Sequence, residues 1–266
     1  MIEIDHVTKR YGSHTAVSDL TLTVEPGRIY GFLGPNGAGK STTMNIMTGC
    51  LSATEGTVRI EGHDIFDEPN EAKSRIGYHD IFQDAAQAKR LIGYLPEQPP
   101  LYTDMTPREY LRFVARAKGV RGEAFSRQIE NALAVTQTQD VQNRLIKNLS
   151  KGYRQRVGIA QALLGNPSVV ILDEPTASLD AIAEQEIFQQ FDKLRKDKTT
   201  FFVSHRLSSA TIATKILVLE NGLLAEAGNH TELMQKKGIY YELFTTQANR
   251  YITEAQERTN PGGGTA

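Results

Sequence analysis

Residues 34–42 read Gly34-Pro35-Asn36-Gly37-Ala38-Gly39-Lys40-Ser41-Thr42, and this stretch decides the fold. It matches the pattern G-x-x-x-x-G-K-[ST], in which glycines let consecutive backbone N–H groups point at phosphate oxygens. In that pattern Lys40 supplies a positive charge to the β- and γ-phosphates, and the Ser41 hydroxyl is a magnesium ligand. A chance glycine-rich turn is the alternative, but an apolar strand at 28–33 precedes the stretch and a helix at 40–48 is expected after it. The sequence therefore predicts a phosphate-binding loop made by all nine residues.

An acidic pair follows a wholly apolar segment later in the chain. Val169 to Leu172 is uniformly apolar, as expected of a strand covered by helices on both faces, and Asp173 and Glu174 follow directly. At the carboxyl end of that strand Asp173 can hold magnesium through water, and Glu174 can polarise an attacking water. Alone the pair is weak evidence, because helix N-termini attract carboxylates. Together with the phosphate-binding loop it predicts a site that hydrolyses a nucleoside triphosphate.

The patterns on either side predict an α/β fold in three parts. Alternating apolar residues predict half-exposed strands at 2–7 and 20–24, and a short strand is expected at 56–60. Thr106-Pro107-Arg108-Glu109 predicts a capped helix that runs to about residue 118, followed by helices at 123–135 and from about 150. Asn221-Gly222 predicts a hairpin turn. The expected fold is a P-loop core with a mostly parallel sheet, an antiparallel β layer and a helical insertion at about 100–165.

Composition limits the partners. A formal net charge of -1 shows no bulk basicity, so no nucleic acid is expected to bind. The single cysteine, Cys50, excludes an intramolecular disulfide, suits a reducing cytosol and is expected as a small apolar residue at a helix end. No run approaches the roughly 18 apolar residues of a membrane span, and the N-terminus lacks the features of a signal peptide. We expect a cytoplasmic chain that reaches a membrane only through a separate partner.

A further stretch, Leu149-Ser150-Lys151-Gly152-Tyr153, resembles the LSGGQ signature of ABC ATPases. It departs from that signature at Lys151 and Tyr153 but keeps Ser150 and Gly152, and ABC export subunits often tolerate Lys and Tyr there. Four other positions match the family's pattern in order and spacing: Tyr11 resembles the adenine-stacking aromatic residue, Gln98 the Q-loop glutamine, Asp180 the D-loop aspartate and His205 the switch histidine. The resemblance covers about residues 1–250 and leaves 251–266 as a flexible tail.

The resemblance implies both cofactors and partners. It implies ATP and Mg²⁺, with Ser41, Gln98 and Asp173 as metal ligands and Glu174, Gln98 and His205 as catalytic residues. It also implies a second ATPase chain, so that ATP closes a head-to-tail homodimer in which the phosphate-binding loop of one chain faces Ser150 of the other. A multi-span membrane permease is the other implied partner, which places the chain on the inner face of the cell membrane and makes it the ATPase subunit of an exporter.

Two other functions stay open. A soluble ABC-type clamp acting on ribosomes or nucleic acid would use the same chemistry, but such proteins usually carry two ATPase domains in one chain or long inserts. A nucleotide-binding module without turnover is disfavoured by Glu174 and His205.

The two ends of the chain resemble different ABC branches. Residues 1–167 are similar to stand-alone ATPase subunits of bacterial exporters, and residues 168–250 to ATPase domains fused to exporter membrane domains. A natural recombinant, an engineered chimera and a computed sequence all fit this pattern.

A 16-residue segment occurs twice in succession, at 63–78 and 79–94. Each copy begins His-Asp-Ile-Phe and ends Ile-Gly-Tyr, and about 20 residues is the minimum for a solenoid unit, so we interpret the pair as a tandem duplication. Only one Ile-Gly-Tyr can fill the sheet position before the Q-loop. We expect Ile92 to Leu95 there, which leaves Asp64 to Asp80 as a surface excursion.

Overall fold

A six-stranded sheet forms the centre of the protein. The computed structural model describes residues 1–66, 89–176, 179, 183–184, 186–187, 198–204 and 210–259, with side chains up to residue 249. The strand order is β10-β9-β3-β8-β7-β6. The bounds are β3 (Ile29–Leu33), β6 (Ile92–Leu95), β7 (Val169–Asp173), β8 (Thr199–Val203), β9 (Lys215–Glu220) and β10 (Leu223–Gly228). Strands β3, β7 and β8 are buried along their whole length, as expected for parallel strands covered on both faces.

Among the described strands of this sheet, β10 alone runs antiparallel to its neighbour, because a tight turn joins it to β9. Asn221 and Gly222 both have positive φ, 51° and 80°, which is the backbone of a two-residue hairpin turn. The hairpin predicted from these two residues is therefore confirmed.

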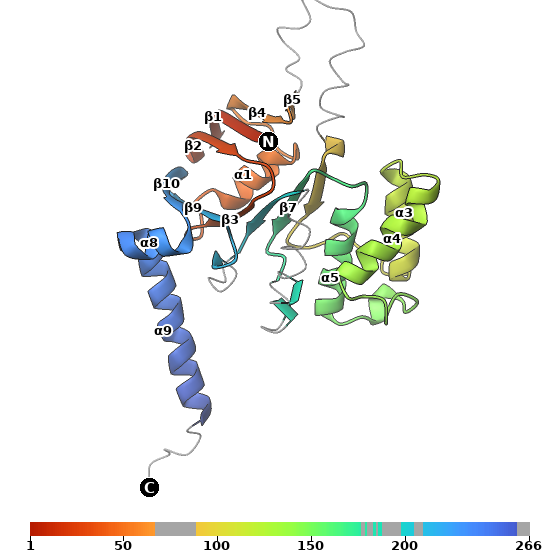
Figure 1. The fold of residues 1–266 in the computed structure, drawn as a ribbon. Coiled ribbons are helices and arrows are strands. Elements are labelled where there is room, and N and C mark those ends of the chain that lie inside the picture. The colour runs from red at the N-terminus through yellow and green to blue at the C-terminus, as the bar shows by residue number, and fades with distance from the viewer. Residues whose placement is uncertain are drawn as a thin grey trace, which may run out of the picture.

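An antiparallel layer covers one face of this sheet. It contains β1 (Ile2–Tyr11), β2 (His14–Val24), β4 (Glu55–Ile60) and β5 (His63–Asp64), in the order β2-β1-β4-β5. Helix α1 (Lys40–Met47) lies between this layer and the central sheet, and one apolar core joins all three (Figure 1). Strands β1 and β2 are longer than the alternating pattern predicts, and the first ends at Tyr11.

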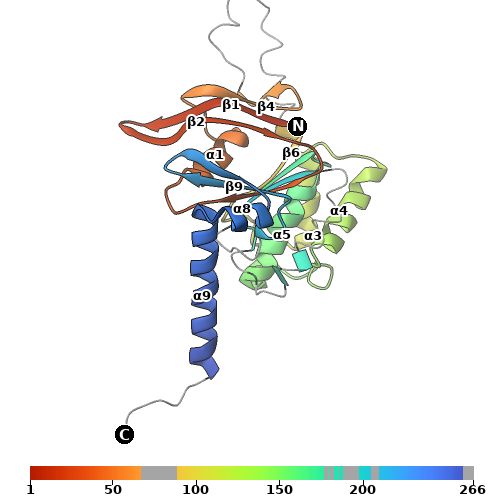
Figure 2. The ribbon, with the colours of Figure 1, turned by 60° about the vertical axis from the view of Figure 1, so that its left-hand side comes forward.

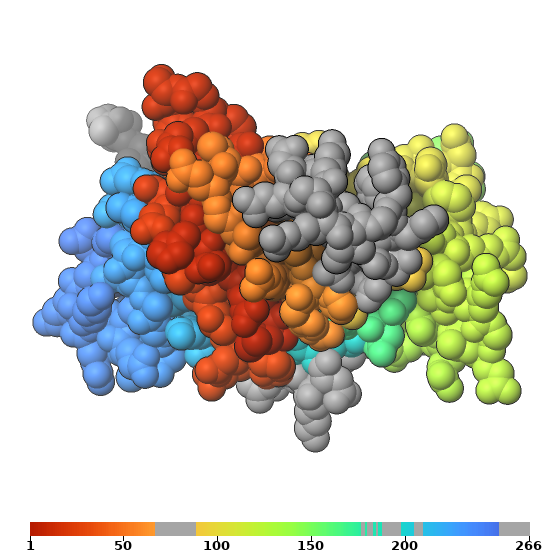
Figure 3. Space-filling model, turned by 90° about the horizontal axis from the view of Figure 1, so that it is seen from above, coloured from red at the N-terminus to blue at the C-terminus, as the bar shows by residue number. Residues whose placement is uncertain are grey.

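Helices gather on the other side. Helix α5 (Lys151–Leu163) packs on β6 and β7, and α3 (Pro107–Ala117) and α4 (Glu123–Val135) pack on α5. The capping box predicted for α3 is present, because the Thr106 hydroxyl accepts from Glu109 N and the Glu109 carboxylate accepts from Thr106 N. A short 3-10 turn, η2 (Ile146–Asn148), leads into α5. From above, the antiparallel layer lies between these helices and the C-terminal part of the chain (Figure 3).

The C-terminal helices contradict one predicted boundary. After α8 (His230–Lys236), α9 (Ile239–Thr259) packs near its start and then runs away from the body (Figure 2). The expected limit at residue 250 therefore falls inside a helix, because no helix-breaking residue occurs before Pro261. Residues 260–266 lie outside the described residues.

Cys50 also differs from its prediction. It is exposed rather than packed as an apolar residue. The backbone turns away from α1 at Gly49, which has a φ of 69°, so Cys50 follows the turn outwards.

The duplicated segment contributes at both of its ends. The second copy supplies β6, which pairs in parallel with β7, as expected. The first copy does not leave the fold at Asp64: His63–Asp64 pair with β4, and Ile65 is fully buried in the core. The predicted surface excursion is wrong at that start, because Ile65 needs an apolar environment. Residues 67–88, with the Ile76-Gly77-Tyr78 of the first copy, lie outside the described residues.

Candidate active site

The loop between β3 and α1 needs its glycines for conformation and for space. Gly34, Gly37 and Gly39 have φ values of 141°, 81° and 95°, which other residues rarely adopt. A Cβ atom at Gly34 would lie 2.1 Å from the Leu219 carbonyl oxygen, and one at Gly39 would lie 2.3 Å from the Ala16 carbonyl oxygen. Strands β9 and β2 thus press on the loop from two sides. The loop is held in a shape whose N–H groups can face an anion.

Lys40 begins α1 and points its amine back at the same loop. Its Nζ donates to the carbonyl oxygens of Gly34 at 2.7 Å and Pro35 at 2.9 Å. Burial lowers the pKa of Lys40, and the neighbouring carboxylates of Glu174 and Asp173 act in the opposite direction. A cation is therefore fixed at the loop, close to two buried acids.

Those two acids lie at the carboxyl end of β7. Asp173 is the last residue of the strand and Glu174 follows it, and both are at least nine-tenths buried. Burial raises the pKa of Asp173, the neighbouring Glu97 raises it further, and Lys40 opposes both. The structure thus brings the phosphate-binding loop and the acidic pair into electrostatic range of each other.

A hollow of about 360 Å³ opens on the outer side of the loop. Tyr11 stands at its edge, half exposed, with the Lys9 ammonium 5.3 Å from the centre of its ring. The lining residues come from the β1–β2 turn and from the loop with the first turn of α1: Tyr11, His14, Ala16, Asn36, Gly37, Gly39, Lys40, Ser41 and Thr42. An aromatic ring and a phosphate cradle in one hollow suit a nucleotide.

His14 was missed by the sequence reasoning. It pairs with Tyr11 across the β1–β2 turn, and so reaches the same hollow. The signal was present, since Gly12-Ser13 is a two-residue turn that places the flanking residues opposite each other.

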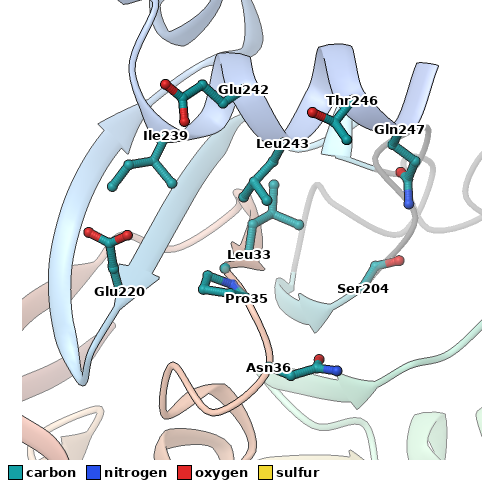
Figure 4. A pocket seen from close by; sticks show the side chains of 11 residues that line it. Leu33, Pro35, Asn36, Ser204, Glu220, Ile239, Glu242, Leu243, Thr246 and Gln247 are labelled. Atoms are coloured by element: carbon teal, nitrogen blue, oxygen red, sulfur yellow. The ribbon is translucent and has the colours of Figure 1, made fainter. Parts of the chain in front are cut away.

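A larger hollow of about 570 Å³ lies on the other side of the loop, between Leu33–Asn36 and α9 (Figure 4). Leu243 of α9 points towards Leu33 there, and Ser204 closes one end. The carboxylates of Glu220 and Glu242 also line it, so it would repel a triphosphate. The hollow beside Tyr11 is therefore the better phosphate site, although it is smaller.

The signature residues lie elsewhere. Ser150 is the exposed N-cap of α5, and its hydroxyl accepts from Tyr153 N at 3.3 Å. A third hollow of about 460 Å³ is lined by Gln137, Ser150, Lys151, Gly152, Tyr153, Arg156, Leu179 and Ala183, and it shares no residue with the hollow beside Tyr11. The Tyr153 hydroxyl donates to Asp140 Oδ2 at 2.6 Å, which gives this departure from the LSGGQ pattern a contact of its own. Within one chain, Ser150 and Gly152 therefore do not join the phosphate-binding loop.

The remaining predicted residues are placed only in part. Gln98 is exposed, beyond the end of β6, and its neighbour Glu97 lies near enough to Asp173 to affect the pKa of that residue. Asp180 and His205 lie outside the described residues. Ser204, which precedes His205, is buried at the end of β8.

The site fits a magnesium nucleotide by the chemistry of its donors. Among the described residues, no three His, Cys, Asp or Glu side chains form a group that could hold a metal. Magnesium is usually held by one or two carboxylates together with substrate phosphates. The Asp173 carboxylate and the Ser41 hydroxyl are suitable oxygen ligands for such a magnesium site.

Comparisons with known proteins point one way. The sequence profile of the ABC transporter family matches residues 17–177. A proposed multidrug export ATP-binding/permease protein of Staphylococcus aureus is 36% identical over 248 residues, which are 92% of this chain and 41% of that protein. The chain thus spans about two fifths of the length of this curated relative.

Two solved structures are similar in fold. The dimeric structure of MJ0796, described as a bacterial ABC transporter cassette, superposes with a TM-score of 0.75 at 27% identity, covering 86% of this chain and 98% of the other. A bacterial Atm1-family ABC exporter with ATP bound gives a TM-score of 0.78 at 26% identity, over 93% of this chain and 42% of the other. In the part of the chain that the structure describes, no helix combines the length and apolarity needed to cross a membrane.

Proposed function

We propose, from the premise that this chain belongs to the ABC transporter family, that it binds and hydrolyses ATP and energises export through a membrane-spanning partner. The observation that supports this most strongly is the convergence of Lys40 with Asp173 and Glu174, beside a hollow that Tyr11 completes. A phosphate-binding loop without the acids would support binding alone.

ATP would bind across the hollow beside Tyr11. Lys9 occupies one side of the Tyr11 ring, so adenine would stack on the other side. The loop N–H groups and Lys40 would hold the phosphates, with Lys40 exchanging its carbonyl partners for phosphate oxygens. Mg²⁺ would be held by Ser41, Asp173 and Gln98, and when bound it neutralises charge on the phosphates.

Glu174 would be the general base. It follows Asp173 at the carboxyl end of β7, so a second carboxylate lies at the edge of the sheet where the phosphates would end. There it would accept a proton from the water that attacks the γ-phosphate, while Lys40 stabilises the negative charge of the leaving group. His205 would assist at the γ-phosphate, as the family pattern implies.

A second copy of the chain would complete each site. Ser150 and Gly152 lie on a hollow separate from the loop, so they could reach a phosphate only on another chain. Asp180 would also contribute at that interface. The dimeric arrangement of the MJ0796 cassette supports the same assembly for this chain.

The coupling to transport is proposed from the relatives. The Staphylococcus aureus protein is named for both an ATP-binding and a permease function, and this chain matches 41% of its length. We propose a multi-span permease as a separate partner and a location on the inner face of the cell membrane. The substrate would be chosen by that partner.

The test combines turnover with partner capture. Mg²⁺-dependent ATP hydrolysis whose specific activity rises with protein concentration would support a dimeric ATPase. Capture of a multi-span membrane protein by the tagged chain from detergent extracts would support transport coupling. Enrichment of ribosomes or DNA in its place would favour the soluble clamp, and no hydrolysis at any concentration would contradict the proposal.

A further inference from the structure

Helix α5 carries a buried glutamine that the proposed chemistry does not use. Gln155 is 4% exposed and lies on the helix that Ser150 caps. Its Nε2 donates to the carbonyl oxygen of Glu174 at 3.2 Å. The helix that presents the signature residues is therefore bonded directly to the backbone of the proposed base.

The backbone of Glu174, which accepts this hydrogen bond, has an unusual conformation. Its φ is 48°, a left-handed conformation that costs a residue with a side chain about 1–2 kcal/mol. Its backbone is bonded to two different elements: Glu174 N donates to Val203 O of β8 at 3.1 Å, and Glu174 O accepts from Gln155. One contact comes from the sheet and the other from the signature helix.

We infer that Gln155 is a positioning residue for Glu174, and that it links the signature face of the chain to the chain's own hydrolytic site. The inference rests on the proposed role of Glu174. Because the carbonyl direction fixes the peptide plane after Glu174, losing the bond lets the Cα–Cβ direction of Glu174 relax. An error of about 1 Å in the position of a catalytic group can lower a rate about a hundredfold.

The same helix offers a matched control. Gln161 is partly buried, and its Oε1 accepts from the Tyr110 hydroxyl of α3 at 2.5 Å. It therefore tests the loss of one glutamine hydrogen bond from α5 without any contact with Glu174. A purely structural role for Gln155 would make the two glutamines equivalent.

The first experiment compares Gln155→Leu with Gln161→Leu in the full chain. Gln155→Leu is expected to lower kcat for ATP at least about tenfold with KM and ATP affinity unchanged, while Gln161→Leu keeps the parent kcat. Both are expected to lower the melting temperature. Equal kcat values in the two variants would overturn the inference.

A second variant works even if Gln155→Leu fails to fold. In Gln155→Glu, a protonated carboxyl can donate to Glu174 O, whereas an ionised one cannot. The ratio of variant to parent kcat is therefore expected to rise as the pH falls from about 8 to about 6, since burial raises the pKa of a carboxyl. A ratio that stays low and constant over this pH range would contradict the inference.

The Glu174→Gln background separates the two hypotheses. If Gln155 acts through Glu174, adding Gln155→Leu to Glu174→Gln should lower the residual rate little further. A Glu174→Gln enzyme with the parent rate would refute the proposed base itself. A slow Glu174→Gln enzyme together with a Gln155→Leu enzyme at the parent rate would refute only the positioning role.

Discussion

The hollow beside Tyr11 and the hollow at Ser150 are built in opposite ways. Beside the first lie several buried groups: a loop packed closely against two strands, a buried lysine, and two buried acids that affect the pKa of that lysine. The second is a surface feature, where Ser150 is exposed and caps a helix that continues into the core. The first has a buried cation at the phosphate-binding loop, whereas the second offers a hydroxyl and a bare backbone, with Lys151 and Arg156 beside them. In the proposed head-to-tail dimer, each hollow is one half of a site and takes its other half from a second chain.

The largest effect on ATP binding is expected from replacing Lys40, the fixed cation of the first hollow. Lys40→Ala should weaken ATP binding about a hundredfold, because a buried charged partner of the phosphates is removed. Isothermal titration calorimetry with ATP and Mg²⁺ measures it. Lys147→Ala is the control, since Lys147 is exposed and pairs only with Asp104 in the described residues. Equal ATP affinity in the two variants would defeat the assignment of the site.

The next effect separates binding from chemistry within the same hollow. Glu174→Gln should keep ATP binding but lower kcat by about 10²–10⁴, because an amide cannot accept the proton. The uncleaved nucleotide should also favour a dimer, seen by light scattering with ATP and Mg²⁺. Glu130→Gln, which alters an exposed partner of Arg108, should behave like the parent in both assays. Parent-like turnover in Glu174→Gln would show that another group is the base.

Mixing two inactive chains tests whether the halves combine. Ser150→Arg blocks the signature face and Lys40→Ala disables the loop, yet a mixed dimer contains one site with both residues intact. We expect at most about half of the parent turnover per mixed dimer, and almost none from either variant alone. Hydrolysis measured after mixing gives the result. Proven mixed dimers without any activity would argue against head-to-tail assembly.

Local patterns predicted the contiguous elements around the first hollow, but not the contacts between residues from separate elements. The loop from Gly34 to Thr42 and the capping box at Thr106 are contiguous in sequence, so short-range chemistry fixes them. The roles of His14 and Gln155 were not predicted, because each depends on a contact that forms only on folding. His14 lies opposite Tyr11 across a hairpin, and Gln155 of α5 bonds to Glu174 at the end of β7.

The antiparallel layer shows the same limit. Ile65 was predicted to lie in a surface excursion, because the sequence pattern of residues 63–66 does not indicate a strand. Strand β5 contains only two residues, which is too short for a recognisable alternation. The roles of Asp180 and His205 stay predictions. The composite origin of the chain also stays a prediction, because the match to the export protein covers both parts of the chain.

The smallest effect on stability and activity is expected from a deletion in the duplicated segment, which connects the antiparallel layer to β6. Deleting 63–78 joins Gly62 to His79-Asp80-Ile81-Phe82, the same four residues that now follow it. Both β5 and β6 therefore keep their sequences, and the shorter connection should stabilise the fold by about 1 kcal/mol. Urea unfolding and the ATPase rate measure the change.

A control shows whether, in the deleted chain, residues 79–82 take the position that residues 63–66 hold in the full chain. Ile65→Ala in the full chain should lower the free energy of unfolding by about 2–4 kcal/mol, because Ile65 is fully buried. In the deleted chain, Ile81→Ala should cost about the same, since Ile81 then follows β5 as Ile65 does now. Loss of folding on the deletion would show that the extra 16 residues hold the antiparallel layer to the sheet. A folded chain without ATPase activity would show that the segment positions Gln98 for the proposed hydrolysis.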